Sequence, residues 1–152
     1  MMEEQTTLDG SEYIEPISND WETPKELFQE LNKEFNFTLD PCCTHETAKC
    51  EKYFTIADDG LKQSWKDHRV FMNCPYSDIP QWVEKASKES RGIERAELVV
   101  GLLPVWTDQE WFHEYVYCKT SIRFLQKRVP FLLTGKKGNN LPRFPSMIII
   151  WR

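Results

Sequence analysis

The chain of 152 residues is long enough for one domain with a core of moderate size, and its 40% hydrophobic and 13% aromatic content excludes disorder of the whole chain. No apolar stretch approaches the roughly 20 residues of a membrane span, and the acidic N-terminus lacks the features of a signal peptide. We therefore expect a cytoplasmic protein with no membrane partner. Five cysteines, an odd number without framework spacing, indicate reduced thiols rather than disulfides.

The net charge of −5 is unevenly spread along the chain. Residues 119–152 contain eight lysines and arginines and no acid, so this segment carries +8 and the preceding residues carry −13. A basic segment of this kind can face phosphates, which would make nucleic acid a partner in spite of the acidic total. The same cations can also solvate a surface and balance the acidic part, so both interpretations stay open.

The first half of the chain predicts one helix and short strands. Residues 1–19 hold five acids, no base and few large apolar residues, which indicates a flexible acidic arm ahead of a single domain over residues 20–152. A capping box at Thr23-Pro24-Lys25-Glu26 predicts a helix that ends near Asn36. We expect short strands at 37–39 and 53–55, a polar stretch with helical potential at 44–51, and a loop at 57–60.

The second half alternates strands and helices. A strand is predicted at 69–72, followed by a helix from residue 80 to about 90 that Ser77 or Asp78 can cap. The continuous apolar run at 98–103 is typical of a parallel strand buried on both faces. A second capping box at Thr107 opens a helix to about residue 117, and strands follow at 121–126 and 147–151 around an irregular segment. The alternation predicts an α/β sandwich with a largely parallel central sheet. Trp65, Trp82 and Trp111 are the tryptophans expected in its core.

Polar motifs follow the predicted strands at the edge where ligands bind in such sheets. Asp40-Pro41, Asn73-Cys74-Pro75-Tyr76 and Pro104 each come directly after a strand, so they are expected to line one crevice.

The tetrapeptide Asn73-Cys74-Pro75-Tyr76 suits a particular chemistry. An amino nitrogen on a planar ring is a poor nucleophile because its lone pair is delocalised. The Asn73 side-chain oxygen and the neighbouring backbone carbonyl can accept its two hydrogens together, which draws the nitrogen toward tetrahedral geometry. The Tyr76 ring can stack on the base and orient it. An Asn and a Pro after a strand also make an ordinary turn, so the motif by itself leaves both readings open.

Taken together, these motifs resemble the compact, phage-type DNA N6-adenine methyltransferases, a Dam-like family on the class I S-adenosylmethionine-dependent fold. The similarity covers the chain from about residue 20 to its end, and it depends on the order and spacing of the blocks. The matching blocks are Asp20-Trp21-Glu22-Thr23-Pro24, Phe37-Thr38-Leu39-Asp40-Pro41-Cys42, Ala48-Lys49-Cys50 with Tyr53-Phe54-Thr55, Asp58-Asp59-Gly60-Leu61 with Trp65, 70–77, Leu102-Leu103-Pro104 with Thr107-Asp108 and Trp111-Phe112-His113, and Phe144-Pro145-Ser146 before Trp151.

The resemblance implies a fold and a set of site residues. The fold is a three-layer, Rossmann-like methyltransferase sandwich without a separate target-recognition domain. The catalytic set is Asn73, Cys74, Pro75 and Tyr76, and the residues implied to bind S-adenosylmethionine are Trp21, Thr23, Pro24, Asp40, Pro41, Cys42 and Asp59.

Three departures from the family pattern stand out. Cys74 replaces the usual proline, although only its backbone carbonyl is needed. Cys42-Cys43-Thr44 stands where the wider class has a glycine-rich loop, and Val105-Trp106 stands where Ala and Arg are more common. The lost arginine removes a cation on the substrate side, whereas the Trp106 ring can stack on an unpaired base.

The implied reaction is direct methyl transfer to the 6-amino group of an adenine flipped out of DNA, with no metal. The expected DNA contacts lie in and around the basic segment 135–140, where Lys and Arg face phosphates and Asn reads a base edge. These residues are Arg128, Lys136, Lys137, Asn139, Asn140 and Arg143. We expect a short or relaxed recognition sequence, and a phage or prophage protein that acts in a bacterial cytoplasm, with protection from restriction as one purpose.

Three alternatives remain at this point. Cys42, Cys43, His45 and Cys50 could hold zinc, but adjacent cysteines are awkward for tetrahedral chelation and no paired Cys-x-x-Cys spacing is present. Asn-Pro-Pro-Tyr-like motifs also serve methylation of glutamine side chains in proteins, although the basic C-terminal segment favours nucleic acid. The departures at Cys74 and Trp106 are also compatible with a protein that binds DNA or cofactor and transfers nothing.

Overall fold

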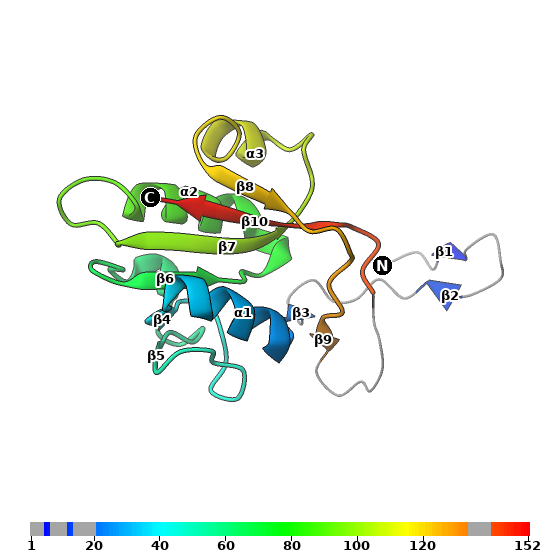
Figure 1. Ribbon diagram of the computed structural model, residues 1–152, viewed down its shortest axis with the longest axis horizontal. Helices are drawn as coiled ribbons and strands as arrows, with labels where there is room; N and C mark the ends of the chain where they lie inside the picture. Colours follow the sequence, from blue (N-terminus) through cyan, green and yellow to red (C-terminus); the bar gives the residue numbers. More distant parts are fainter. Residues whose placement is uncertain (1–4, 7–11, 14–20, 134–140) are drawn as a thin grey trace.

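A central mixed sheet organises the protein, whose computed structural model describes residues 5–6, 12–13, 21–133 and 141–152 (Figure 1). The order of its strands is β5-β4-β6-β7-β10-β8. The strands of this sheet are β4 (Leu39–Asp40), β5 (Lys52–Tyr53), β6 (Arg69–Met72), β7 (Leu98–Pro104), β8 (Ser121–Phe124) and β10 (Ser146–Trp151).

Strand direction brings several loops to one edge of this sheet. Strands β5, β4, β6 and β7 are mutually parallel, whereas β10 runs antiparallel to both β7 and β8. The carboxyl ends of β4, β6 and β7 therefore meet at the same edge, together with the start of β10, where Ser146 pairs with Pro104. The predicted largely parallel α/β sheet is confirmed.

Helices cover both faces of the sheet and make the three layers. Helix α1 (Lys25–Phe35) lies in front of the sheet in Figure 1, and α2 (Ile79–Glu89) lies behind it. The Phe28 ring of α1 packs edge-on against Phe71 of β6 at 5.1 Å. On the other face, Trp82 of α2 stacks on Trp65 at 6.4 Å, and α3 (Glu110–Tyr115) packs on α2. The three tryptophans expected in the core, Trp65, Trp82 and Trp111, are all buried.

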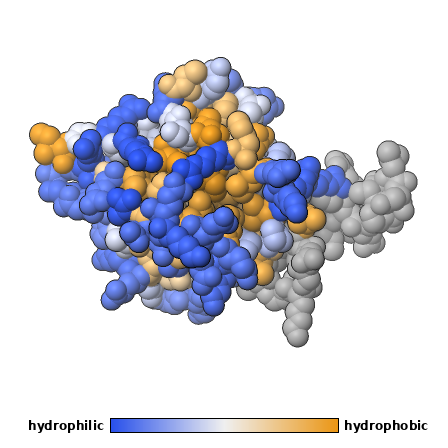
Figure 2. All heavy atoms as spheres, viewed as in Figure 1, coloured by the Kyte–Doolittle hydropathy of each residue, from blue (hydrophilic) through white to orange (hydrophobic). Residues whose placement is uncertain are grey.

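Polar residues cover most of the face seen in Figure 2, and apolar residues reach the surface above α1, over β7, β8 and β10. Phe124 of β8, for example, is exposed. None of the helices among the described residues is long and apolar enough to cross a membrane.

The capping boxes predicted at Thr23 and Thr107 are both wrong, although the helix predicted after each of them, α1 and α3, is present. The N-cap residues are Pro24 for α1 and Gln109 for α3, and neither helix has a side-chain cap. The Thr23 hydroxyl oxygen accepts a hydrogen bond from the side chain of Asn73, the residue after β6, instead. Helix α2 begins one residue before the predicted Pro80, after a short 3₁₀ turn, η2 (Tyr76–Asp78). Asp78 is its N-cap residue, and it makes no side-chain cap hydrogen bond.

The helix potential of residues 44–51 is not realised, since only a turn at 45–47 forms. Lys49 N donates to an Asp40 carboxylate oxygen at 3.0 Å, so a side chain of β4 takes a backbone donor that a helix would use. Thr44 N donates to Thr47 Oγ1 at 3.0 Å and Thr47 N donates to Thr44 Oγ1 at 3.2 Å, as at the start of a helix, but the helix does not continue.

Sequence patterns also missed a two-stranded ribbon at the edge of the sheet. Strand β3 (Trp21–Glu22) pairs antiparallel with β9 (Leu132–Leu133), which lies inside the segment predicted to be irregular. A further 3₁₀ turn, η1 (Gly60–Lys62), follows the predicted loop. Of the predicted acidic arm at 1–19, only β1 (Gln5–Thr6) and β2 (Glu12–Tyr13) are described, and they pair with each other. The flexible arm and the domain limits stay predictions.

Candidate active site

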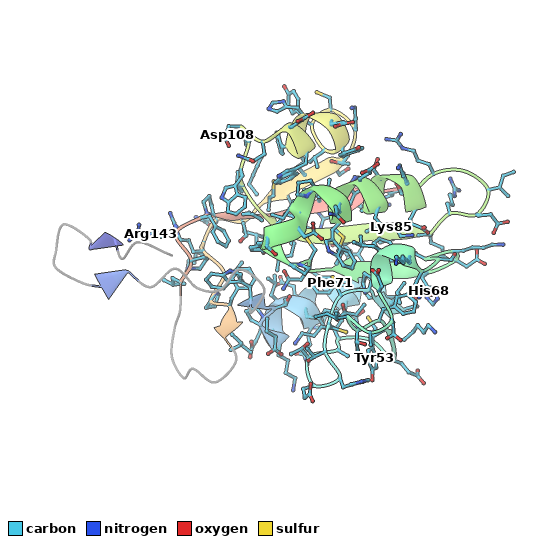
Figure 3. The ribbon with its side chains drawn as sticks, turned by 180° about the vertical axis from the view of Figure 1, so that it is seen from behind. Tyr53, His68, Phe71, Lys85, Asp108 and Arg143 are labelled. Atoms are coloured by element: carbon cyan, nitrogen blue, oxygen red, sulfur yellow. The ribbon has the colours of Figure 1, made fainter. Side chains whose placement is uncertain are left out.

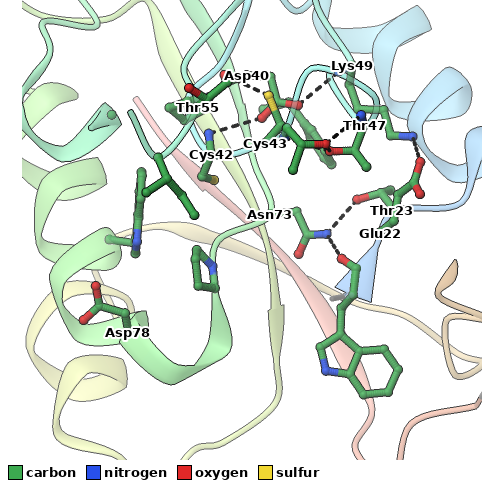
Figure 4. A pocket seen from close by; sticks show the side chains of 18 of the residues that line it. Glu22, Thr23, Asp40, Cys42, Cys43, Thr47, Lys49, Thr55, Asn73 and Asp78 are labelled. Atoms are coloured by element: carbon green, nitrogen blue, oxygen red, sulfur yellow. Dashed lines mark hydrogen bonds and ion pairs between the residues drawn. The ribbon is translucent and has the colours of Figure 1, made fainter. Parts of the chain in front are cut away.

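A pocket of about 440 Å³ opens at the carboxyl edge of β4 and β6, beside β3 (Figure 4). It brings together most of the residues that the sequence predicted for catalysis and cofactor binding. The predicted residues that line it are Trp21, Thr23, Asp40, Pro41, Cys42, Asp59, Asn73 and Pro75. Pro24, Cys74 and Tyr76 are not in the lining. Cys74 and Tyr76, the neighbours of Pro75 in the sequence, are both buried.

The two polar atoms of the Asn73 side chain differ, because the nitrogen is hydrogen-bonded whereas the oxygen has no donor among the described residues. Its Nδ2 donates to the Trp21 carbonyl oxygen at 2.6 Å and to Thr23 Oγ1 at 3.0 Å. Its Oδ1 is buried, and no hydrogen-bond donor among the described residues contacts it. Figure 4 shows the amide nitrogen directed at Thr23 and the Trp21 carbonyl, with the oxygen turned away from both. An unpaired buried acceptor lowers the stability of the fold by about 1–3 kcal/mol. A ligand that donates a hydrogen bond to it would remove this penalty.

Asp40 closes the pocket at the end of β4. Its carboxylate accepts from the Lys49 backbone N–H at 3.0 Å and from the Cys42 backbone N–H at 3.4 Å, so it shapes the loop that follows β4. Burial raises the pKa of Asp40 from 3.8 to about 6, and the hydrogen bonds from the two amides oppose that rise only in part.

Two charged side chains of the pocket were not assigned roles by the sequence. The Lys49 ammonium contacts a Glu22 carboxylate oxygen at 3.1 Å, which ties β3 to the loop after β4. Both side chains are largely buried, with 16% and 29% of their surface exposed. Glu22 and Lys49 occur in the matching blocks, but nothing in their local pattern signals that they pair across 27 positions.

Gly60 sets how closely the pocket walls approach. A Cβ atom at this position would lie 2.0 Å from the Pro41 carbonyl oxygen, so no other residue fits without moving the backbone. The preceding Asp59 has a φ of 55°, in the left-handed region, as tight turns require. The two predictions for Asp59, a turn and a place in the cofactor pocket, are both compatible with this geometry.

Beside Asn73 lies a group of five rings that we call the aromatic cluster. Tyr76 is 7% exposed, and its ring contacts Phe144 at 5.6 Å and Trp106 at 6.3 Å, both edge-on. The Tyr76 hydroxyl donates to the Leu102 carbonyl oxygen at 3.4 Å. The members of the cluster are Trp21, Tyr76, Trp106, Phe131 and Phe144. Phe131 was missed, because it lies in the segment read as irregular.

The structure describes only part of the predicted DNA contacts. Arg128 is exposed and donates to the Pro142 carbonyl oxygen at 2.8 Å, and Arg143 is also exposed. Lys136, Lys137, Asn139 and Asn140 lie outside the described residues. Arg123, which lies in the acid-free range 119–152, donates two hydrogen bonds to Glu34 at 2.6 and 2.7 Å, so its charge is compensated within the fold.

The cysteines show no sign of a metal site. The structure finds no group of three or more His, Cys, Asp or Glu side chains that could hold a metal among the residues that it describes. All five cysteines are free. Burial raises the pKa of the Cys50 thiol to about 12 and that of Cys74 further, so both stay protonated at neutral pH.

Comparison with known proteins decides the family. The family model described as DNA N-6-adenine-methyltransferase (Dam) matches residues 10–152. The chain belongs to this Dam family. One relative, the DNA N-6-adenine-methyltransferase of Haemophilus phage HP1 (strain HP1c1), is 28% identical over 136 residues, which cover 86% of this chain and 77% of the relative. The DNA N-6-adenine-methyltransferase of Escherichia phage T1 is 29% identical over 107 residues, which cover 69% of this chain and 44% of that protein.

Membership of the Dam family gives the site geometry its context. The matched range includes every element that lines the pocket, from β3 to the start of α2. The six-stranded sheet, mostly parallel, is compatible with a compact class I methyltransferase fold.

Proposed function

We propose that the protein is an adenine-specific DNA methyltransferase, which transfers a methyl group from S-adenosylmethionine to the 6-amino group of adenine in DNA. Two lines of support meet here. The Dam family model covers residues 10–152, and two phage relatives carry the name of this activity. The observation that carries the proposal is the buried Asn73 Oδ1, an acceptor that no donor among the described residues contacts and that lies at a pocket, as methylation of an amino group needs.

The charges that line the pocket fit a cationic cofactor. Glu22, Asp40, Asp59 and Asp78 line it, against Lys49 as the single basic residue in the lining. A surplus of carboxylates in a partly buried site favours a positively charged ligand. When bound, S-adenosylmethionine supplies a methyl group that its sulfonium makes electrophilic. Trp21, Pro24, Asp40, Pro41, Cys42 and Asp59 are the residues that we propose hold it, whereas the Thr23 hydroxyl is already engaged by Asn73 Nδ2.

Asn73 acts on the acceptor nitrogen. Its Oδ1 accepts one hydrogen of the adenine 6-amino group, and the Cys74 carbonyl accepts the other. These bonds strengthen as positive charge develops on the nitrogen, so they favour the transition state over the ground state. Cys74 serves as well as proline in this role, because the carbonyl belongs to the backbone. Pro75 fixes the turn that presents both acceptors.

The aromatic cluster receives the base. Extruding adenine from a duplex costs a few kcal/mol, and stacking on an aromatic ring returns about 1–3 kcal/mol. Tyr76 is the proposed stacking ring, and the half-buried Trp106 ring, which contacts it edge-on at 6.3 Å, extends this aromatic surface.

The basic segment holds the DNA backbone. Arg128, Lys136, Lys137 and Arg143 contact phosphates in this proposal, and Asn139 or Asn140 reads a base edge. We propose a short or relaxed recognition sequence. Reversal of Lys136 and Lys137 to Glu should weaken DNA binding and reduce its salt dependence. Unchanged affinity and salt slope would remove this segment from the DNA interface.

The acceptor can be established with labelled cofactor. The protein is incubated with S-adenosylmethionine carrying a tritiated methyl group, together with DNA or with a protein extract. Label should enter DNA, and Asn73→Ala should abolish the transfer. Label in protein alone would identify a glutamine-amide acceptor instead, and cofactor binding without any transfer would indicate a binding protein.

A further inference from the structure

The orientation of the Asn73 amide is fixed by what its nitrogen contacts. The Trp21 carbonyl oxygen can only accept hydrogen bonds, and it lies 2.6 Å from Asn73 Nδ2. A flipped amide would bring oxygen against oxygen at that distance, which is repulsive. Thr23 Oγ1 takes the second N–H at 3.0 Å. With both N–H groups used, the amide must present Oδ1 on its other side (Figure 4).

The two acceptors are themselves held firmly. The Trp21 ring packs edge-on against Phe131 at 5.2 Å and against Phe144 at 5.7 Å. The ion pair between Glu22 and Lys49 anchors the next residue, and β3 pairs with β9 on its other side. Thr23 is 2% exposed. The segment 21–23 is therefore a rigid support from outside the sheet.

This use of Thr23 also explains why the hydroxyl does not cap the helix that follows it. A Ser or Thr just before a helix ordinarily accepts a backbone N–H of the first turn. Helix α1 has no side-chain cap, and the hydroxyl oxygen accepts from Asn73 instead. The helix gives up a favourable contact, and the Asn73 amide gains a fixed direction.

We propose that Thr23, with the Trp21 carbonyl, is a positioning residue for catalysis, which holds the Asn73 amide so that its oxygen faces the amino group to be methylated. The proposal rests on the function given above and adds to it a role of this segment on the acceptor side of the reaction. It differs from the cofactor-binding role that the family resemblance implies for Thr23. The two roles predict different kinetics.

The kinetic test compares Thr23→Val with Thr23→Ser in the full chain. Valine keeps the shape and removes the acceptor, whereas serine keeps the acceptor. We expect Thr23→Val to lower kcat about tenfold, the value of one good hydrogen bond in an organised site, and Thr23→Ser to stay within about threefold of the wild type. The affinity for S-adenosylmethionine, measured by titration calorimetry, should change less than about threefold in both variants. A Thr23→Val variant that binds cofactor poorly with an unchanged kcat at saturation would overturn the proposal, and so would equal losses from Val and Ser.

A second measurement does not depend on activity. The side-chain NH₂ of Asn73 gives a pair of amide signals in a proton–nitrogen correlation spectrum, which Asn73→Ala identifies by their loss. The pair should shift in Thr23→Val and exchange with solvent about ten times faster, while Thr23→Ser retains the wild-type behaviour. An unchanged pair in Thr23→Val would contradict the positioning role. If Thr23→Val fails to fold, Thr23→Ala serves in both experiments.

These readouts separate the two claims. A wild-type protein that methylates no DNA defeats the proposed function, whereas the spectrum still reports whether Thr23 orients the Asn73 amide.

Discussion

The two sides of Asn73 differ in what they offer a ligand. On one side lies the pocket of about 440 Å³, whose lining combines apolar side chains such as Phe71 and Trp82 with carboxylates and Lys49. On the other side the aromatic cluster is already packed, since Tyr76 is 7% exposed and contacts rings on several sides. A cofactor can therefore enter a space that exists, whereas a base reaches the Tyr76 ring only when its neighbours give way. Figure 3 shows the molecule from the opposite side, with α2, which carries Lys85, in front of the sheet and with Arg143 at the end away from His68.

The largest effect is expected at Asn73, which borders both sides. Asn73→Ala removes the acceptor for the amino hydrogen but no residue proposed to hold the cofactor, so kcat should fall about 10²–10³-fold, as loss of one transition-state hydrogen bond does elsewhere. Cofactor affinity, measured by titration calorimetry, should stay near the wild-type value. A matching loss of cofactor affinity would show that Asn73 belongs to the pocket side.

A pH-dependent effect of about 2 kcal/mol is expected on the pocket side, from Asp40. The pKa of its carboxyl is about 6 in the fold, against an ordinary value of 3.8. As the pH rises from about 4 to 6, the unfolded chain releases this proton before the folded one, so the Asp40 contribution to the free energy of unfolding falls across that window and levels off near pH 7.

Urea unfolding of the wild type and Asp40→Asn at several pH values between 4 and 7 measures this effect. The difference in unfolding free energy, wild type minus variant, should decline by about 2 kcal/mol between pH 4 and pH 6 and level off near pH 7. A flat difference, or one that rises with pH, would mean that burial does not govern this carboxyl.

On the aromatic side, Tyr76→Ala should weaken catalysis through the base. Loss of stacking should lower kcat/KM for DNA by an amount that corresponds to about 1–3 kcal/mol, while cofactor binding is unaffected. Tyr76→Phe is the matched control, because it keeps the ring and loses only the hydroxyl bond to the Leu102 carbonyl at 3.4 Å. Equal losses in both variants would assign the effect to the hydroxyl rather than to stacking.

The smallest effect is expected at Cys74, which lies between the two sides. Cys74→Pro gives the Asn-Pro-Pro-Tyr sequence that the family resemblance leads us to expect, and kcat should remain within about threefold of the wild type, because only the backbone carbonyl is proposed to take part. Steady-state kinetics on DNA checks this. A tenfold or larger change in either direction would give the Cys74 side chain a role of its own.

The sequence predicted the parts of this molecule that depend on strong local patterns. The apolar run at 98–103 became β7 (Leu98–Pro104), and the predicted strand at 69–72 became β6 with the same bounds. The site residues that follow strands were also brought together, since parallel strands carry their ends to one edge.

What the sequence missed depends on contacts between distant segments. Strands β3 and β9 are two residues long, too short for any periodicity, and they exist because they pair with each other. The pattern around Thr23 favoured a helix cap, and only the fold shows that its hydroxyl meets Asn73, 50 positions away. At residues 44–51, the Asp40 carboxylate accepts from the Lys49 backbone N–H, a donor that the predicted helix would have used.

The most direct test of the central claim is chemical identification of the product. The protein is incubated with S-adenosylmethionine and unmethylated DNA of mixed sequence, and the DNA is then digested to nucleosides. The nucleosides are separated and identified by mass spectrometry, and the Asn73→Ala variant is treated in parallel. The wild type should produce N6-methyladenosine in its deoxy form, and the variant should produce almost none. Absence of this nucleoside with folded, cofactor-binding wild-type protein would contradict the account.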